Sequence, residues 1–155
     1  MSKYNSKKVE YNGIKFDSKV ELDYYHYLNE QLDKGFIKSF ELQVKVELIP
    51  KYEKFGIKHR AITYTPDFLI THLDDSKEYV DIKGFGTLAS DLRRKLFDYL
   101  YPNDKLTWLS YVKKYGGWIE YTKLKKMRRG SKKWLYVHYL IVEMDVIKEL
   151  LQKLE

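Results

Sequence analysis

TPDFLI at residues 65–70 and YVDIKG at residues 79–84 are the two stretches of this sequence that decide its fold. Both combine β-branched and aromatic residues in runs short enough for strands, and DDS at residues 74–76 favours a turn between them. We therefore predict a β-hairpin. Because alternate residues of a strand point to the same side, its second strand should present Asp81 and Lys83 on one face.

The rest of the chain predicts helices and further strands around this hairpin. Helices are expected over residues 16–34, 88–100 and 118–129 and at the C-terminal end. Strands are expected over residues 37–49, 61–71, 78–83, 106–112 and 134–142. Three consecutive strands with short connections should pair antiparallel, whereas the later strand–helix–strand unit should give a parallel crossover. The predicted fold class is therefore α/β (mixed α+β), with a small mixed sheet flanked by helices.

Acidic side chains on the hairpin indicate metal chemistry. The hairpin should bring Asp67 next to Asp81, and adjacent carboxylates repel unless a cation lies between them. Mg²⁺ or Mn²⁺ takes oxygen ligands and keeps positions open for water and phosphate. Lys83 is placed to help deprotonate an attacking water or to neutralise charge on the phosphate. Glu21 falls on the first predicted helix in phase with core residues, where an acid needs a partner. This set fits metal-assisted phosphodiester hydrolysis.

Two alternative interpretations of these residues do not need a metal site. A D-x-K triplet is common on exposed strands, where it forms a solvated charged face. GFGTLA at residues 84–89 matches the G-x-G-x-x-A fingerprint of dinucleotide-binding folds. That fingerprint expects an acid at the end of the next strand, but two lysines follow Val112, and it leaves Asp67 unexplained. We expect these glycines instead to let the chain turn sharply beside the metal site, where a DNA backbone approaches.

Charge and composition narrow the choice of partner. The 155 residues have the length of one domain and carry a formal net charge of +7. Residues 123–133 (KLKKMRRGSKK) hold seven basic residues and no acid, which favours a polyanion such as nucleic acid, although a solvated helix face has the same composition. The absence of cysteine excludes disulfides and thiol chemistry. With no membrane span or secretory signal in the pattern, we expect a cytoplasmic protein without a membrane partner.

Five motifs, in order along the chain, resemble a known family. They are FDSKVELDYYHYL (16–28), ELQVKVELIP (41–50), KHRAITYTPDFLI (58–70), YVDIKGFGT (79–87) and RRKLFDYLYP (93–102). The sequence resembles the PD-(D/E)XK nuclease superfamily and, within it, a phage-encoded family grouped with Holliday-junction-resolvase-like endonucleases. The resemblance runs from about residue 4 to residue 133. It implies a restriction-endonuclease-like core, Mg²⁺ (or Mn²⁺) bound by Glu21, Asp67 and Asp81, and Lys83 as the catalytic lysine. Many relatives have glutamate where this chain has Asp81.

Basic residues are the predicted contacts to DNA. Arg93, Arg94 and Lys95 follow the motif strand, and analogy with the superfamily favours Lys95. The candidates from the basic segment are Lys125, Lys126, Arg128, Arg129, Lys132 and Lys133. His59 and Arg60 are placed to contact the DNA backbone.

The sequence thus predicts a metal-dependent DNA endonuclease selective for branched DNA, and the resemblance implies a role in phage recombination, replication or DNA processing. Its nuclease domain should span residues 1–133, with residues 134–155 as a strand–helix extension that packs on it or forms a dimer contact. Junction cleavage needs two symmetric cuts, so this version also predicts a homodimer. The alternative is a non-catalytic nucleic-acid-binding module with a vestigial acidic site. Glu41 and Gln43 are equally compatible with a surface position and with the site.

Overall fold

The structure is a computed structural model that describes residues 7–130 of the chain. The expected extension at residues 134–155, together with Lys132 and Lys133, lies outside this range. The described helices are α1 (Lys19–Asp33), α2 (Leu88–Leu100), the short 3₁₀ helix η1 (Lys113–Tyr115) and a helical segment at residues 121–130. The strands are β1 (Val9–Tyr11), β2 (Ile14–Phe16), β3 (Ser39–Leu42), β4 (Val46–Ile49), β5 (Tyr52–Lys54), β6 (Ile57–His59), β7 (Ile62–Tyr64), β8 (Phe68–Thr71), β9 (Lys77–Ile82), β10 (Lys105–Val112) and β11 (Gly117–Glu120).

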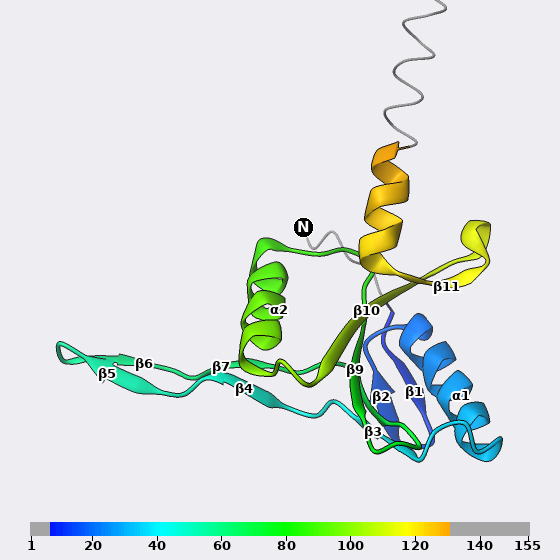
Figure 1. Cartoon of the computed structure of the whole chain (residues 1–155), viewed down its shortest axis with the longest axis horizontal. Helices are drawn as coiled ribbons and strands as arrows, with labels where there is room; N and C mark the ends of the chain where they lie inside the picture. The colour runs from blue at the N-terminus through cyan, green and yellow to red at the C-terminus, as the bar shows by residue number, and fades with distance from the viewer. Residues whose placement is uncertain (1–6, 131–155) are drawn as a thin grey trace, which may run out of the picture.

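The central element is a five-stranded sheet with the strand order β11-β10-β9-β8-β3 (Figure 1). β3 pairs antiparallel with β8, and β8 with β9, as the short connections predict. After α2 the chain returns as β10, which lies parallel to β9, and β11 then pairs antiparallel with β10. The predicted class, a small mixed sheet flanked by helices, is confirmed.

Helices α1 and α2 lie on opposite sides of this sheet, so each face has its own core (Figure 1). The core on the α1 side contains Tyr24, Leu28, Phe68, Ile70 and Val80. The core on the α2 side contains Leu69, Tyr79, Phe97, Leu106 and Trp108. Because successive side chains of β9 point to opposite faces, Asp81 shares the α2 side with Tyr79.

Capping side chains set where both helices begin. Ser18 is the N-cap of α1 and accepts a hydrogen bond from the Glu21 N–H at 3.2 Å. Thr87 caps α2 in a reciprocal capping box with Ser90. The prediction for α2 is confirmed at both ends, and the first predicted helix is confirmed with ends a few residues shorter. Among residues 7–130, no helix has the length and apolar content needed to cross a lipid bilayer.

Two predicted strands are each broken in two. The stretch at residues 37–49 divides into β3 and β4 at Gln43, whose φ of 51° interrupts an extended chain. The stretch at residues 61–71 divides into β7 and β8 around Pro66. As a result β4 and β7 leave the central sheet and pair with each other, and β5 and β6 continue this ribbon outwards. We call residues 46–64 the arm; it projects well beyond the body of the molecule (Figure 1).

Other short elements depart from the sequence prediction. The helix predicted for residues 118–129 is wrong at its start, because residues 117–120 pair with β10 as β11 and the helix begins only at residue 121. The hairpin formed by β1 and β2 was not predicted, since its three-residue strands are too short for periodicity to register. It turns at Asn12 and Gly13, both with positive φ.

Phe97→Ala should lower the free energy of unfolding by about 3–5 kcal/mol, because it removes a fully buried ring and leaves a cavity. The Phe97 ring is 0% exposed and lies 5.0 Å from the ring centroids of both Tyr79 and Tyr101. Urea unfolding measures the change, and Tyr99→Ala on the same helix is the matched control because Tyr99 is 83% exposed. Equal effects of the two substitutions would contradict this assignment of the core.

Candidate functional site

The two aspartates of the hairpin meet where β9 ends. Asp67 directly precedes β8, and its Oδ2 accepts a hydrogen bond of 2.7 Å from the backbone N–H of Ile82. Asp81 is the penultimate residue of β9 and is only 5% exposed. The predicted juxtaposition is therefore confirmed, and a hydrogen bond from the Ile82 backbone to the Asp67 side chain ties the start of β8 to the end of β9.

Asp81 lies at the centre of a buried polar network. Its Oδ2 accepts a hydrogen bond from the Tyr64 hydroxyl and forms an ion pair of 2.7 Å with Lys83 Nζ. The Tyr64 oxygen in turn accepts a hydrogen bond of 2.8 Å from Trp108 Nε1. Burial, followed by the charge of Asp81, raises the pKa of Tyr64, so its hydroxyl stays protonated and remains a donor.

Strand β10 explains why this network forms. Trp108 is paired with Asp81 in the parallel register, which sets the indole beside the carboxylate. Lys83 lies one residue beyond β9, yet its N–H donates to Leu109 O at 2.6 Å, and Ser110 Oγ donates to its carbonyl oxygen. Lys83 Nζ lies 5.2 Å from the centroid of the Trp108 ring, a cation–π contact. The lysine is thus held on both its backbone and its side chain.

Glu21 is buried, as predicted, but it already has structural partners. It is 8% exposed; its Oε2 accepts from the Asp17 N–H at 2.9 Å and its Oε1 from Ser18 Oγ at 3.0 Å. Burial is the main reason its pKa is raised, with smaller contributions from the charges of Asp17 and Asp81. Glu21 therefore closes the first turn of α1 and adds negative charge to the site.

The charge on Asp67 is strongly disfavoured. Burial, and then the neighbouring Asp81 carboxylate, raise the pKa of Asp67 to about 8. The hydrogen bond from Ile82 and the positive charge of Lys83 oppose this rise without cancelling it. A divalent cation beside Asp67 and Asp81 would favour the ionised form of both.

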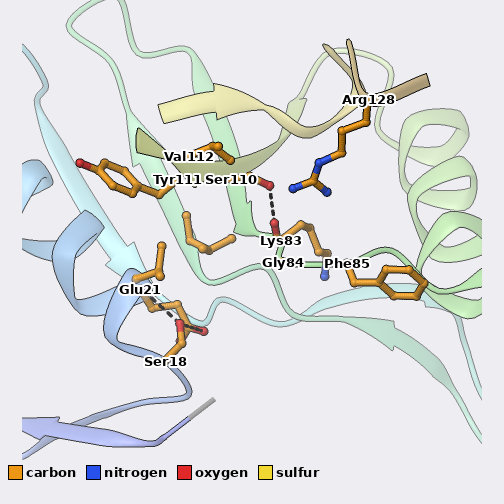
Figure 2. A pocket seen from close by; sticks show the side chains of 11 residues that line it. Ser18, Glu21, Lys83, Gly84, Phe85, Ser110, Tyr111, Val112 and Arg128 are labelled. Atoms are coloured by element: carbon orange, nitrogen blue, oxygen red, sulfur yellow. Dashed lines mark hydrogen bonds between the residues drawn. The ribbon is translucent and has the colours of Figure 1, made fainter. Parts of the chain in front are cut away.

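A cavity of about 400 Å³ adjoins Lys83, and Glu21, Ser110 and Arg128 are among the other residues lining it. Figure 2 shows Arg128 reaching into this cavity from the side opposite Ser18 and Glu21. Glu21 also lines a second cavity of about 290 Å³ together with Asp67 and Gln43. The carboxylate of Glu21 thus lies between the two cavities.

Gln43 is exposed, but it lies beside Asp67. Besides lining the second cavity, it donates its backbone N–H to Asp67 O at 2.9 Å. Glu41 pairs with Leu69 in the sheet and remains exposed. Tyr64 and Trp108 were missed by sequence reasoning. Their types carry no catalytic pattern, and only the register of β9 on β10 brings them to Asp81.

The predicted DNA contacts fall in different places. Arg128 lines the site cavity, as described, whereas Lys95 and Lys125 line a groove of about 430 Å³ between α2 and the helical segment at residues 121–130, together with Trp108. Arg94 also borders this groove, and its guanidinium lies 5.0 Å from the Trp108 ring centroid. The remaining described candidates are exposed side chains, namely Arg93, Lys126 and Arg129. His59 and Arg60 lie on the arm, away from the site.

Gly86 makes room for an aromatic ring. Its N–H donates to Tyr121 Oη at 2.7 Å, and an added Cβ would lie 3.3 Å from the Tyr121 ring. Its φ lies outside the left-handed region, so the sharp turn expected here does not account for this glycine. The close approach instead brings the helical segment at residues 121–130 against the loop that follows Lys83.

The carboxylates of the site are the groups that could hold Mg²⁺. Among residues 7–130, no group of three or more His, Asp or Glu side chains is arranged to hold a metal ion. Mg²⁺ commonly uses only one or two protein carboxylates and fills its octahedron with water and substrate oxygens. The half-buried Asp67 and the buried Asp81 are neighbouring carboxylates that fit that mode of binding, and Glu21 fits it as a further acid nearby rather than as a third ligand.

The chain belongs to the family described as "Protein of unknown function (DUF1064)", which matches residues 1–117. No curated protein and no solved structure matches it significantly. The matched range contains Glu21, Asp67, Asp81 and Lys83, and it ends before the helical segment that carries Lys125 and Arg128.

Asp67→Asn should stabilise the metal-free protein, and the gain should increase with pH. The unfolded chain ionises Asp67 near its ordinary pKa of 3.8 and the folded chain only near 8, so unfolding releases a proton between these values and ionisation costs stability as pH rises. At pH 8 we expect a melting temperature at least about 3 °C higher, which corresponds to about 1 kcal/mol.

Thermal unfolding in EDTA at pH 5 and pH 8 tests this expectation, with Asp23→Asn as an exposed-carboxylate control on α1. Added Mg²⁺ should raise the melting temperature of the unsubstituted protein more than that of Asp67→Asn. A variant no more stable than the unsubstituted protein at pH 8 would show that ionisation of Asp67 does not lower the stability of the fold.

Proposed function

We propose that this protein is a metal-dependent DNA endonuclease that hydrolyses phosphodiester bonds. The observation that supports this most is the convergence of the buried Asp81 carboxylate with the half-buried Asp67 and with Lys83, which lines a cavity of about 400 Å³. Burying two neighbouring acids is unfavourable for the fold itself, which favours a cationic ligand as the reason for their placement. The PD-(D/E)XK resemblance of the same residues supports the same proposal.

The chain's own residues have distinct roles in this proposal. Asp67 and Asp81 would hold Mg²⁺ or Mn²⁺, with Glu21 as a further negative group. When bound, such an ion activates water and stabilises charge on the phosphate. Tyr64, held by Trp108, fixes the rotamer of Asp81 through its hydroxyl. Lys83 is the general-base or electrostatic group nearest to the carboxylates, and phosphate entry would draw its ammonium from Asp81 towards the substrate.

Basic residues around the site are suited to hold the DNA. Arg128 enters the cavity beside Lys83, and Lys95 and Lys125 line the groove on the other side of Trp108. Phosphate contacts of this kind bind without reading sequence. We therefore propose selection by DNA shape, with branched or junction DNA as substrate, a homodimer for paired cuts, and service in phage recombination, replication or DNA processing.

One observation favours the alternative, a nucleic-acid-binding module without catalysis. Lys83 is already paired with Asp81, and both carboxylate oxygens of Glu21 already accept hydrogen bonds. In a purely structural site these contacts would satisfy the acids permanently. The two functions make the same prediction for DNA affinity and opposite predictions for turnover.

The endonuclease should cut labelled DNA only with a divalent metal. Four-way junction, flap, single-stranded and linear duplex substrates are incubated with Mg²⁺, Mn²⁺ or EDTA, and products are resolved on denaturing gels. Asp81→Asn should abolish cutting, because it removes one of the two charges that would hold the metal. Tight binding without cutting of any substrate, with either metal, would leave the binding module as the function.

Lys83→Met should reduce the cleavage rate at saturating DNA by a factor of about 10²–10³, the effect expected when a charged group beside the reacting phosphate is lost. Its affinity for DNA should change by no more than a few fold. Lys77→Met, at the exposed first position of β9, removes the same charge far from the site and should cut at the rate of the unsubstituted protein. Equal activity of both variants would remove Lys83 from the mechanism.

A further inference from the structure

The arm presents surface that the fold itself does not use. All residues from 50 to 62 are exposed, and β5 and β6 pair only with each other among the described strands. Phe55 at the tip is 93% exposed, and Ile57 is 62% exposed. A two-stranded ribbon with exposed apolar side chains is marginally stable by itself and prone to association, so this surface is suited to a partner.

The turn at the tip places a phenylalanine, Phe55, in a backbone conformation that disfavours it. Phe55 and Gly56 have φ values of 52° and 76°, so both central residues of the hairpin loop adopt positive φ. The same chain makes the corresponding turn between β1 and β2 with Asn12 and Gly13, at φ values of 48° and 77°. Asn-Gly suits this conformation, whereas a bulky aromatic residue is disfavoured in it. The Phe55 ring is therefore retained against the local preference of the backbone, as happens at contact sites.

The charge of the arm selects the class of partner. Residues 51–60 (KYEKFGIKHR) contain four basic residues, Lys51, Lys54, Lys58 and Arg60, and the single acid Glu53. Aromatic groups lie among them, including Tyr52 stacked on His59 with ring centroids 4.5 Å apart. Two copies of such an arm would repel each other, whereas a polyanion with planar bases matches both the charge and the rings.

We propose that the arm is a second DNA-binding element, with its lysines on the phosphates and the Phe55 ring against a base at a branch or end. This inference rests on the proposed function, because it assigns DNA as the ligand of the same protein. Strand residues advance roughly 3.3 Å each, so the tip reaches roughly 20 Å beyond Ile49, the last partly buried residue of β4. That reach corresponds to roughly six base pairs of duplex.

The test compares full-length variants by fluorescence anisotropy on a labelled four-way junction in EDTA, so that binding is measured without cutting. Phe55→Asn removes the ring and installs the Asn-Gly pair that the turn prefers, so the hairpin is retained. We expect about tenfold weaker binding, the order of effect for loss of one ring stacked on a base. Affinity within twofold of the unsubstituted protein would overturn the proposed contact between the Phe55 ring and a base.

The lysines are tested by salt dependence. Lys51→Gln, Lys54→Gln and Lys58→Gln combined should make the slope of log affinity against log salt shallower by roughly 0.9 for each lysine that contacts a phosphate. Lys34→Gln, Lys38→Gln and Lys77→Gln combined remove equal charge from the far end of α1 and of the sheet, and their slope should be unchanged. Equal slopes for the two triple variants would overturn the proposal.

Sedimentation of the same variants tests the alternative that a second copy of the chain, rather than DNA, contacts the arm. A dimer that becomes monomeric in Phe55→Asn, with unchanged DNA affinity, would make the arm a contact between two copies and would overturn the inference. The nuclease proposal can fail independently of this inference. If the protein cuts no DNA but the arm variants lose affinity, the arm remains a DNA-binding element. Metal-dependent cutting with unaffected arm variants would overturn the arm alone.

Discussion

The site depends on two carboxylates, the buried Asp81 and the half-buried Asp67, that the fold brings together where β9 ends and β8 begins. Asp67 receives its hydrogen bond from the backbone of Ile82, so the end of β9 cannot move without moving the start of β8. Asp81 is surrounded by Lys83, Tyr64 and, through Tyr64, Trp108. Removing any one of these partners would leave a buried charge less well compensated, which is far more unfavourable than losing an exposed ion pair.

The arm and the site share a residue, so they are not independent parts. Tyr64 is the last residue of β7, at the base of the arm, and its hydroxyl reaches Asp81. The opposite strand of the arm is fixed as well, because Val46 and Leu48 pack in the α2-side core and Tyr101 Oη donates to Glu47 O at 2.7 Å. The proposed binding of DNA at the tip would therefore act on an element whose base contacts the Asp81 carboxylate.

Much of the framework could be predicted from the sequence, and the reasons for the exceptions are physical. Alternation placed Asp81 and Lys83 on one face, and helical phase placed Glu21 towards the core. The break at Gln43 could not be seen, because residues 37–49 keep their apolar alternation while the backbone turns away. The break at residues 65–67 had a signal in Pro66, but apolar residues on both sides of it favoured one continuous strand. Nothing in the sequence gives the register of β9 on β10, so Trp108 and Tyr64 could not be assigned to Asp81 before the strands were paired.

The boundary of the family match divides the proposed chemistry from part of the proposed DNA binding. Residues 1–117 contain the carboxylates, Lys83, Tyr64, Trp108 and the whole arm. The helical segment that follows β11 adds Arg128 to the cavity and Lys125 to the neighbouring groove. Its position is set by Tyr121, which packs against Gly86 immediately beyond the lysine of the site. The segment thus completes the rim of a site whose acids are held in place by contacts within the matched range.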